Sequence, residues 1–287
     1  MLTVAVPNKG SLAEAAADLL TEAGYRQRRD SKDLAIIDAD NDVEFFYLRP
    51  RDIAIYVGEG TLDVGITGRD LLLDSGAHAD EALQLGFGAS TFRFAAPIGT
   101  ITSVDGLRGQ RIATSYPGLL TAWLGERGID ATVVRLDGAV ETSVRLGVAD
   151  AIADVVQTGS TLRQAGLEVF GEPILSSEAV LITRQAHPPQ GGASTMGGFD
   201  ILKRRLESVL VARTYVMMDY DIPADAVDAA VEITPGIESP TISPLRKEGW
   251  VAVRSMVPRA EAQPVMDKLY DLGARGILVM DILACRV

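Results

Sequence analysis

The chain has 287 residues, enough for two or three domains, and its 47% apolar and 23% charged residues are typical of a globular protein. Acidic residues outnumber basic ones by 39 to 27, and the net charge of −12 disfavours nonspecific binding to a nucleic-acid backbone. A single cysteine excludes an intrachain disulfide, and two histidines far apart in sequence disfavour an imidazole metal centre. No apolar run approaches the roughly 18 residues of a membrane span, and the short N-terminal run lacks the features of a signal peptide, so we expect a cytoplasmic protein.

The first part of the chain alternates between apolar strands and amphipathic helices. The predicted elements, in chain order, are a strand at 2–6, a helix at 11–23, a strand at 43–48, a helix at 51–57, a strand at 63–67 and a helix at 69–74. Ser11 and Glu14 have the spacing of a capping box, and Gly24 is placed to end the first helix. This alternation predicts a parallel sheet with helices on its faces.

A second set of α/β units follows. The predicted elements are strands at 92–96, 111–114, 132–136 and 151–156, with helices at 119–127 and 139–146. The apolar strand at 178–183 is a candidate to cross back to the first domain. The segment Gln185–Asp200 is rich in glycine and proline, which predicts a loop.

The pattern changes after Arg213. The predicted order is a strand at 214–219, a helix at 224–231, a strand near Thr241, a strand at 250–257, a helix at 264–272 and a strand at 276–282. This order is that of a ferredoxin-like module.

The most informative segment is ETSVRLGVADAIADVVQTGSTL, at residues 141–162. Its strand contains Asp154 and runs into small and hydroxylated residues that open a helix, namely Thr158, Gly159, Ser160 and Thr161. Backbone N–H groups and hydroxyls at such a place can cradle a phosphate, and Asp154 can reach the hydroxyls of an attached sugar. The alternative is that Thr and Ser merely cap the helix.

The same segment resembles the signature of the ATP phosphoribosyltransferase family, the first enzymes of histidine biosynthesis. The matching positions are Glu141, Gly147, Ala149, Ile152, Asp154, Thr158, Gly159, Thr161 and Leu162. The resemblance continues through VAVPNKGSL, LRPRDIAIYV, DVGITGRD, RLDGAVE and TPGIESPT, and so includes the C-terminal module of the long, regulated form.

The resemblance implies an α/β fold, with a two-lobed core like that of periplasmic binding proteins and a C-terminal ferredoxin-like (ACT-like) regulatory domain. The implied bounds are 1–90 with 184–211 for catalytic domain I, 91–183 for catalytic domain II and 212–287 for the regulatory domain. It also implies a homo-oligomer, as a dimer and a hexamer.

The implied reaction transfers phosphoribosyl from phosphoribosyl pyrophosphate to N1 of ATP and releases pyrophosphate. Asp154 and Glu141 suit the cationic ribose, and by resemblance Lys9, Arg49 and Arg51 contact substrate phosphates. From sequence alone, Lys9, Arg49 and Arg51 are equally explained as solvated caps or surface ion pairs. Asp154 and Glu141 could instead be surface carboxylates, a reading that the signature disfavours. Mg²⁺ is the expected cofactor, carried mostly on phosphate oxygens, and its protein ligands stay open.

The resemblance places Asp70 and Tyr116 near the adenine, although Tyr116 could instead be a loop aromatic packed on the hinge. In the regulatory domain, binding of the inhibitor histidine is expected at Asp221, Ser239, Thr241 and Gly276. The alternative for Asp221 is a helix cap.

A different class of function shares this fold, namely a clamp that binds a small anion without catalysis. The segment LRGQRIATSYPGLL looks like the second lobe of such a binding protein. A binder leaves Asp154 and Glu141 unexplained, and neither an export signal nor a DNA-binding helix-turn-helix is evident. The sequence therefore favours the transferase.

Overall fold

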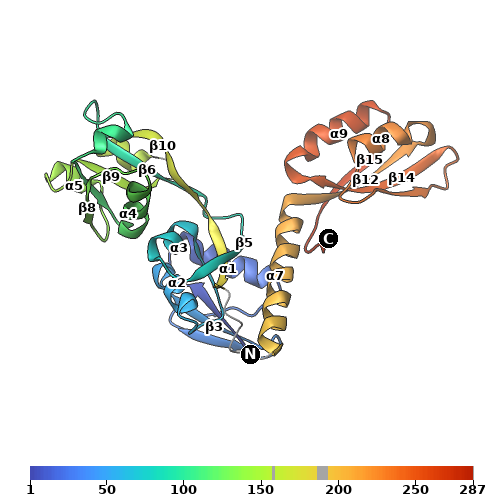
Figure 1. Cartoon of the computed structure of the whole chain (residues 1–287). Coiled ribbons are helices and arrows are strands. Elements are labelled where there is room, and N and C mark those ends of the chain that lie inside the picture. Colours follow the sequence, from blue (N-terminus) through green and yellow to red (C-terminus); the bar gives the residue numbers. More distant parts are fainter. Residues whose placement is uncertain (157–158, 186–192, 287) are drawn as a thin grey trace. The chain divides into compact units, whose positions relative to one another are not determined.

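A computed structural model describes residues 1–156, 159–185 and 193–286, which form two compact units (Figure 1). Unit 1 comprises Met1–Leu20 with Tyr25–Asp200, and unit 2 comprises Thr21–Gly24 with Ile201–Val287. No helix in these described ranges is long and apolar enough to cross a membrane.

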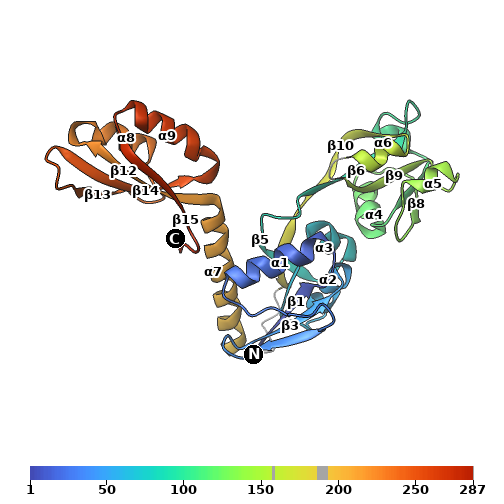
Figure 2. The same ribbon diagram turned by 180° about the vertical axis from the view of Figure 1, so that it is seen from behind.

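The first sheet of unit 1, with its helices, is called lobe 1. Its strand order is β2 (Ala35–Asp38), β3 (Val43–Leu48), β1 (Leu2–Pro7), β4 (Val64–Gly68), β11 (Ala179–Arg184) and β5 (Ala79–Gln84). The central strands β3, β1 and β4 are parallel, as predicted, whereas the outer pairings are antiparallel. The chain leaves β1 through α1 (Ser11–Glu22) toward β3 and returns through α2 (Pro50–Gly58) to β4, so right-handed crossovers place these helices on opposite faces (Figures 1 and 2). A third helix, α3 (Arg69–Ser75), follows β4 directly.

The second sheet of unit 1, with its helices, is called lobe 2. Its strand order is β10 (Leu167–Ser177), β6 (Ser90–Pro97), β9 (Ala151–Val156), β7 (Arg111–Thr114) and β8 (Thr132–Arg135). Its helices are α4 (Pro117–Glu126), α5 (Thr142–Arg145) and α6 (Ser160–Gln164), with a 3-10 turn at Val104–Leu107. Phe92, Phe94 and Leu120 are fully buried in its core.

The chain crosses between the lobes twice, from β5 to β6 and from β10 to β11. The two crossing segments are hydrogen-bonded, because Leu85 N donates to Ala179 O at 3.0 Å and Ala179 N donates to Phe87 O at 2.9 Å. The strand β11 pairs with β4 and β5 and so belongs to lobe 1. The expected bounds 91–183 for domain II are therefore too long at this end: lobe 2 stops at the crossover before Ala179.

Unit 2 contains a sheet in the order β13 (Thr241–Pro244), β14 (Trp250–Pro258), β12 (Tyr215–Pro223) and β15 (Arg275–Asp281). The helices α8 (Val227–Ile233) and α9 (Ala262–Asp271) cover one face of it (Figure 1). Alternate residues of β12, from Val216 to Ile222, are buried against those helices. The predicted ferredoxin-like order is confirmed.

The predicted loop at Gln185–Asp200 is partly wrong, because α7 spans Ala193–Thr214; residues 186–192 lie outside the described residues. The buried residues Leu202, Leu206 and Val209 follow helical spacing. A side chain at Gly198 would begin 3.4 Å from Leu2 Cβ, at an ordinary van der Waals distance, so this part of the helix packs beside β1.

Candidate active site

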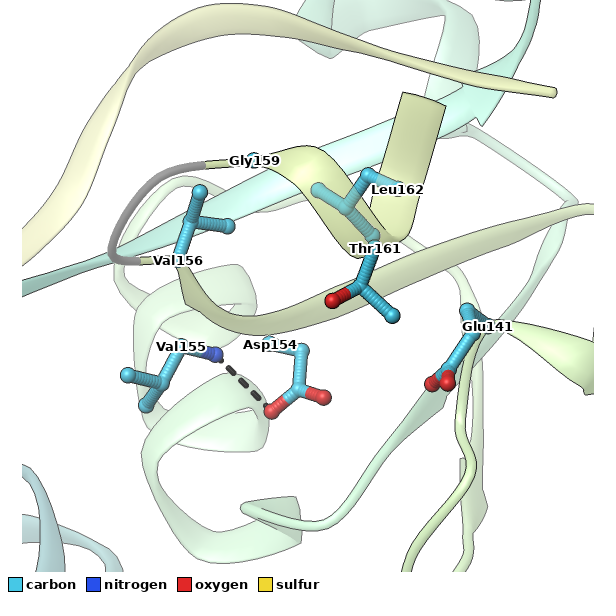
Figure 3. A pocket seen from close by; sticks show the side chains of 7 residues that line it. All are labelled: Glu141, Asp154, Val155, Val156, Gly159, Thr161 and Leu162. Carbon is cyan, nitrogen blue, oxygen red and sulfur yellow. Dashed lines mark hydrogen bonds between the residues drawn. The ribbon is translucent and has the colours of Figure 1, made fainter. Parts of the chain in front are cut away.

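A pocket of about 290 Å³ lies at the end of β9 (Figure 3). Its lining residues are Glu141, Asp154, Val155, Val156, Gly159, Thr161 and Leu162. Four predicted site residues, Glu141, Asp154, Gly159 and Thr161, are therefore brought together. Gly159 has φ +67°, a left-handed conformation that favours glycine. Ser160 begins α6 with an exposed side chain outside this lining, and Thr158 lies outside the described residues.

Asp154 is in an unfavourable environment for a charged carboxylate. Burial raises the pKa of Asp154, and the negative charge of Glu141 raises it further. Hydrogen bonds from Val155 N, at 2.8 Å, and from Ser115, together with the positive charge of Arg51, offset only part of this pKa increase. Two acids facing one pocket with incomplete compensation form a site suited to positive charge.

Tyr116 joins the two lobes at this site. Burial raises the pKa of Tyr116, and the charge of Asp70 together with their mutual hydrogen bond raises it further, so the hydroxyl stays protonated. The ring packs edge-on against Phe92, with centroids 5.3 Å apart, and the guanidinium of Arg51 lies 4.9 Å from its centroid. The ring thus packs against the core of lobe 2 and beneath Arg51, while the hydroxyl reaches Asp70.

Asp70 lies in the first turn of α3 and is only 7% exposed. Its backbone N–H donates to Ser177 Oγ at 3.0 Å, and that hydroxyl donates to Asp70 Oδ1 at 2.8 Å. Ser177 is the last residue of β10, directly before the chain crosses to lobe 1, so a residue of lobe 2 orients the Asp70 carboxylate. The sequence analysis singled out neither residue: Ser177 stands in no motif, and Ser115 lies within LRGQRIATSYPGLL without a role of its own.

The three predicted cations occupy different environments. β1 and β3 end in register at Pro7 and Leu48, so Lys9 and Arg49 follow the same sheet edge, and both are exposed. Arg51 lies in the first turn of α2, and its charge acts on Asp154 and Tyr116. The structure therefore connects Arg51 to the pocket and leaves Lys9 and Arg49 at the edge of the sheet.

Comparison with known proteins identifies the family. The family model described as ATP phosphoribosyltransferase matches residues 49–205, and that of the HisG C-terminal domain matches residues 212–284. The chain belongs to the ATP phosphoribosyltransferase family. The ATP phosphoribosyltransferase of Pseudarthrobacter chlorophenolicus is 66% identical over the full length of both chains, and that of Streptomyces coelicolor is 62% identical, also over both full lengths. The solved ATP phosphoribosyl transferase (HisG:HisZ) complex from Thermotoga maritima matches with a TM-score of 0.61 and 25% identity, covering 72% of this chain and 99% of that one.

These matches confirm the predicted family, its long form and the transferase class. Members of the ATP phosphoribosyltransferase family catalyse the first step of histidine biosynthesis, with ATP and phosphoribosyl pyrophosphate as substrates, and so does this chain. The binding-only alternative is set aside, because the relatives that match over the whole chain are transferases. The predicted fold class is confirmed as well.

The residues expected to bind histidine lie in unit 2, where the structure brings two of the four together. A side chain at Gly276, which has φ +60°, would begin 3.8 Å from Asp221 Oδ2. Asp221 is not a helix cap, because the 3-10 turn after it is preceded by Pro223 and has no side-chain cap.

The other two residues lie elsewhere on the sheet. Thr241 is in register with Arg254 of β14, whereas Asp221 is in register with Ala252 of the same strand. Ser239 precedes β13 and is exposed. The structure therefore does not join Ser239 and Thr241 to Asp221.

Proposed function

We propose that the pocket at the end of β9 holds the phosphoribosyl group of phosphoribosyl pyrophosphate. The observation that carries this proposal is the pairing of two carboxylates, Asp154 and Glu141, in one pocket with Gly159 and Thr161. Glycine at φ +67° lets the backbone approach a phosphate closely, and the Thr161 hydroxyl adds a donor.

The chemistry asked of these residues is mainly electrostatic. As pyrophosphate leaves, positive charge develops on the ribose, and adenine N1 attacks the anomeric carbon. Asp154 and Glu141 stabilise that charge, directly or through the ribose hydroxyls, more strongly in the transition state than in the ground state. The remaining contribution is the alignment of the two substrates.

ATP is proposed to bind beside this pocket. The Asp70 carboxylate, oriented by Ser177, is an acceptor for the exocyclic amine of adenine, and Tyr116 supplies a ring and a protonated hydroxyl. Arg51, with Lys9 and Arg49 from the neighbouring strand ends, is proposed to bind the phosphates of the substrates.

Mg²⁺ is proposed as the cofactor. The described part of the chain contains no group of three or more His, Cys, Asp or Glu side chains placed to hold a metal ion. Asp154 and Glu141 nevertheless fit an ion that uses one or two protein carboxylates and completes its shell with phosphate oxygens and water. When bound, Mg²⁺ would neutralise the leaving pyrophosphate.

Unit 2 is proposed to bind histidine at Asp221 and Gly276 and to inhibit the enzyme, which requires two global states with different affinity for histidine. A homo-oligomer, as a dimer and a hexamer, and a cytoplasmic location stay predictions.

The proposed site is tested by pyrophosphate release from ATP and phosphoribosyl pyrophosphate, with and without Mg²⁺. Thr161→Ala removes a donor and Gly159→Val strains the backbone, so both should raise KM for phosphoribosyl pyrophosphate more than KM for ATP. Thr132→Ala, at an exposed position on β8, is the matched control. An unchanged KM for phosphoribosyl pyrophosphate in both variants would remove the cradle from the mechanism.

A further inference from the structure

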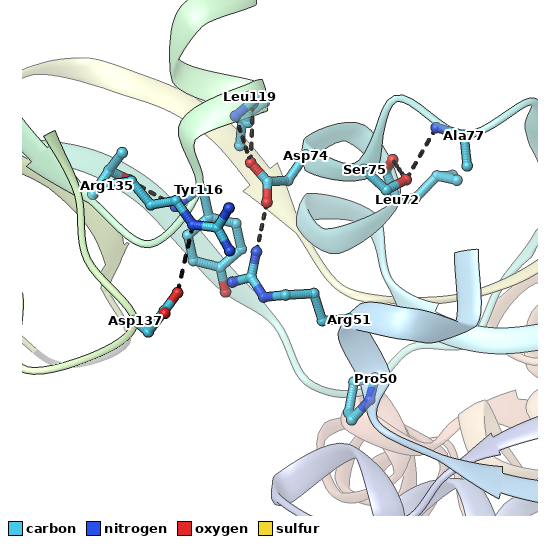
Figure 4. A network of polar contacts seen from close by, with 12 residues as sticks. Pro50, Arg51, Leu72, Asp74, Ser75, Ala77, Tyr116, Leu119, Arg135 and Asp137 are labelled. Carbon is cyan, nitrogen blue, oxygen red and sulfur yellow. Dashed lines mark hydrogen bonds and ion pairs between the residues drawn. The ribbon is translucent and has the colours of Figure 1, made fainter. Parts of the chain in front are cut away.

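The carboxylate of Asp74 connects the two lobes. Asp74 lies in α3 of lobe 1, yet its Oδ1 accepts hydrogen bonds from the backbone N–H groups of Gly118, at 2.9 Å, and Leu119, at 3.1 Å, in lobe 2 (Figure 4). Its Oδ2 pairs with Arg51 Nη1 at 2.6 Å. The Asp74 side chain is only 8% exposed, so this ion pair is shielded from solvent on one side.

The two N–H groups belong to the first turn of α4, which has no cap of its own. Its N-cap residue is Tyr116, which makes no side-chain cap hydrogen bond, and Pro117 follows. First-turn N–H groups lack partners within a helix and carry partial positive charge, so an acid is stabilising there. Here the acid, Asp74, comes from the other lobe, so the hydrogen bonds that cap α4 also hold α3 against α4.

The backbone is also fitted to this contact. A side chain at Gly118 would collide with the carbonyl oxygen of Asp74. Gly125 lies on the same helix and has no neighbouring atom within 4 Å of an added Cβ. Of these two glycines of α4, only Gly118 is required for the lobes to approach.

The contact bears on the proposed site through Arg51. Its guanidinium pairs with Asp74 on one side and lies over the Tyr116 ring, 4.9 Å from the centroid. Its charge also acts on Asp154 and lowers the pKa of that carboxyl. The Arg51 side chain is 43% exposed, so it is held in place and still open to a ligand.

We propose that Asp74 is a positioning residue for phosphoribosyl transfer, latching α3 to α4 so that Arg51 and Tyr116 are held in place beside Asp154. This inference rests on the proposed function, because it assumes that transfer occurs at the Asp154 pocket. A latch that fixes geometry without touching substrate affects the alignment of the reacting groups more than the affinity for either substrate.

Two variants break the latch in different ways. Asp74→Ala removes both the acceptor for the first-turn N–H groups of α4 and the charge that pairs with Arg51. Gly118→Ala leaves Asp74 intact but forces α3 and α4 apart. We expect each to lower kcat by about 10- to 100-fold with little change in KM for either substrate, because small misplacements of reacting groups have effects of this size. The double variant should lose little more than the stronger single variant, since both break one contact.

The controls separate the latch from general damage. Gly125→Ala makes the same substitution in the same helix at an open position. Asp150→Asn removes an exposed ion pair with Arg111 in lobe 2. Both should keep full turnover.

A second measurement tests the latch without turnover. In a Cys285→Ser background, spin labels at Leu34→Cys and Ile98→Cys, positions 71% and 72% exposed in lobes 1 and 2, report the distance between the lobes. We expect Asp74→Ala and Gly118→Ala to shift or broaden this distance distribution, whereas Gly125→Ala should not. Unchanged kcat, or lowered kcat with an unchanged distance distribution, would overturn the latch. Failure of the proposed site is a separate outcome, because it would appear as full activity in Asp154→Asn whatever the label distance.

Discussion

Replacing Asp154 with asparagine should have opposite effects on catalysis and on stability. Asparagine keeps the shape and the acceptor for Val155 N, which now donates to Asp154 Oδ1 at 2.8 Å, but it removes the charge. The same buried charge is proposed to stabilise the cationic ribose. The variant should therefore lose turnover while its folded state tolerates, or gains from, the substitution.

The size of the catalytic effect follows from Coulomb's law. A unit charge about 4 Å from a developing cation contributes about 4 kcal/mol at an effective dielectric constant of about 20. If the ribose carried a full positive charge in the transition state, removing the Asp154 charge would lower kcat by about 1,000-fold. We expect a loss of about 100- to 1,000-fold, because the charge on the ribose is only partly developed and Glu141 remains.

The stability effect has a definite sign and pH window. The pKa of Asp154 in the folded state is raised above its ordinary value of 3.8, first by burial and then by Glu141. Below pH 3.8 the carboxyl is protonated in both the folded and the unfolded state, and its favourable contribution to the free energy of unfolding is complete. This contribution is lost as the pH rises through the folded-state pKa. At pH 7 the charged carboxylate therefore destabilises the fold. Asp154→Asn should therefore melt at or above the parent temperature at pH 7, and the difference should shrink toward pH 4.

Asp150 provides a control of the opposite sign. Hydrogen bonds from the Arg111 side chain and backbone lower the pKa of Asp150. The Asp150 carboxylate therefore adds to the free energy of unfolding at neutral pH, and this contribution is lost as the pH falls through the folded-state pKa. Asp150→Asn should lower the melting temperature at pH 7 and keep activity. Melting curves from pH 4 to 7 and pyrophosphate release measure both variants. Full turnover in Asp154→Asn, or a melting temperature well below that of the parent at pH 7, would refute the reasoning.

Two further predictions concern the ATP and histidine sites. Ser177→Ala removes the hydroxyl that orients Asp70, which is the loss of one buried hydrogen bond worth about 1 kcal/mol. KM for ATP should rise about fivefold, while KM for phosphoribosyl pyrophosphate stays the same. Equal changes in both KM values would indicate a general disturbance instead. Asp221→Ala should abolish inhibition by histidine and keep substantial activity. Asp225→Ala, a control at an exposed position nearby, should still be inhibited by histidine. Inhibition of Asp221→Ala as strong as that of the parent would refute this site.

Local patterns in the sequence predicted much of the fold. The strands at 43–48, 111–114 and 151–156 have the predicted bounds, because each is a mainly apolar run next to turn residues. The pocket residues Asp154, Gly159 and Thr161 were also found, because they stand within one short segment.

Elements that depend on distant partners were missed. The strand β5, with the sequence ADEALQ, is largely polar and becomes a strand by pairing with β11, about 100 residues later. The same limit applies to side chains: Ser177 and Asp70 are 107 residues apart, and only the crossover between the lobes brings them together.

The sequence predicts the phosphate-binding residues but not the contacts between the lobes, because these two kinds of site make different demands on the chain. A phosphate cradle needs consecutive backbone groups, so it leaves a local motif. A contact between lobes needs only complementary groups on two separate elements, as with Asp74 and the first turn of α4, and it leaves none. Because Arg51 comes from lobe 1 and Asp154 from lobe 2, the geometry of transfer depends on such contacts as much as on the motif. We therefore expect a chain with every residue of the motif intact to lose turnover through one added methyl group at Gly118.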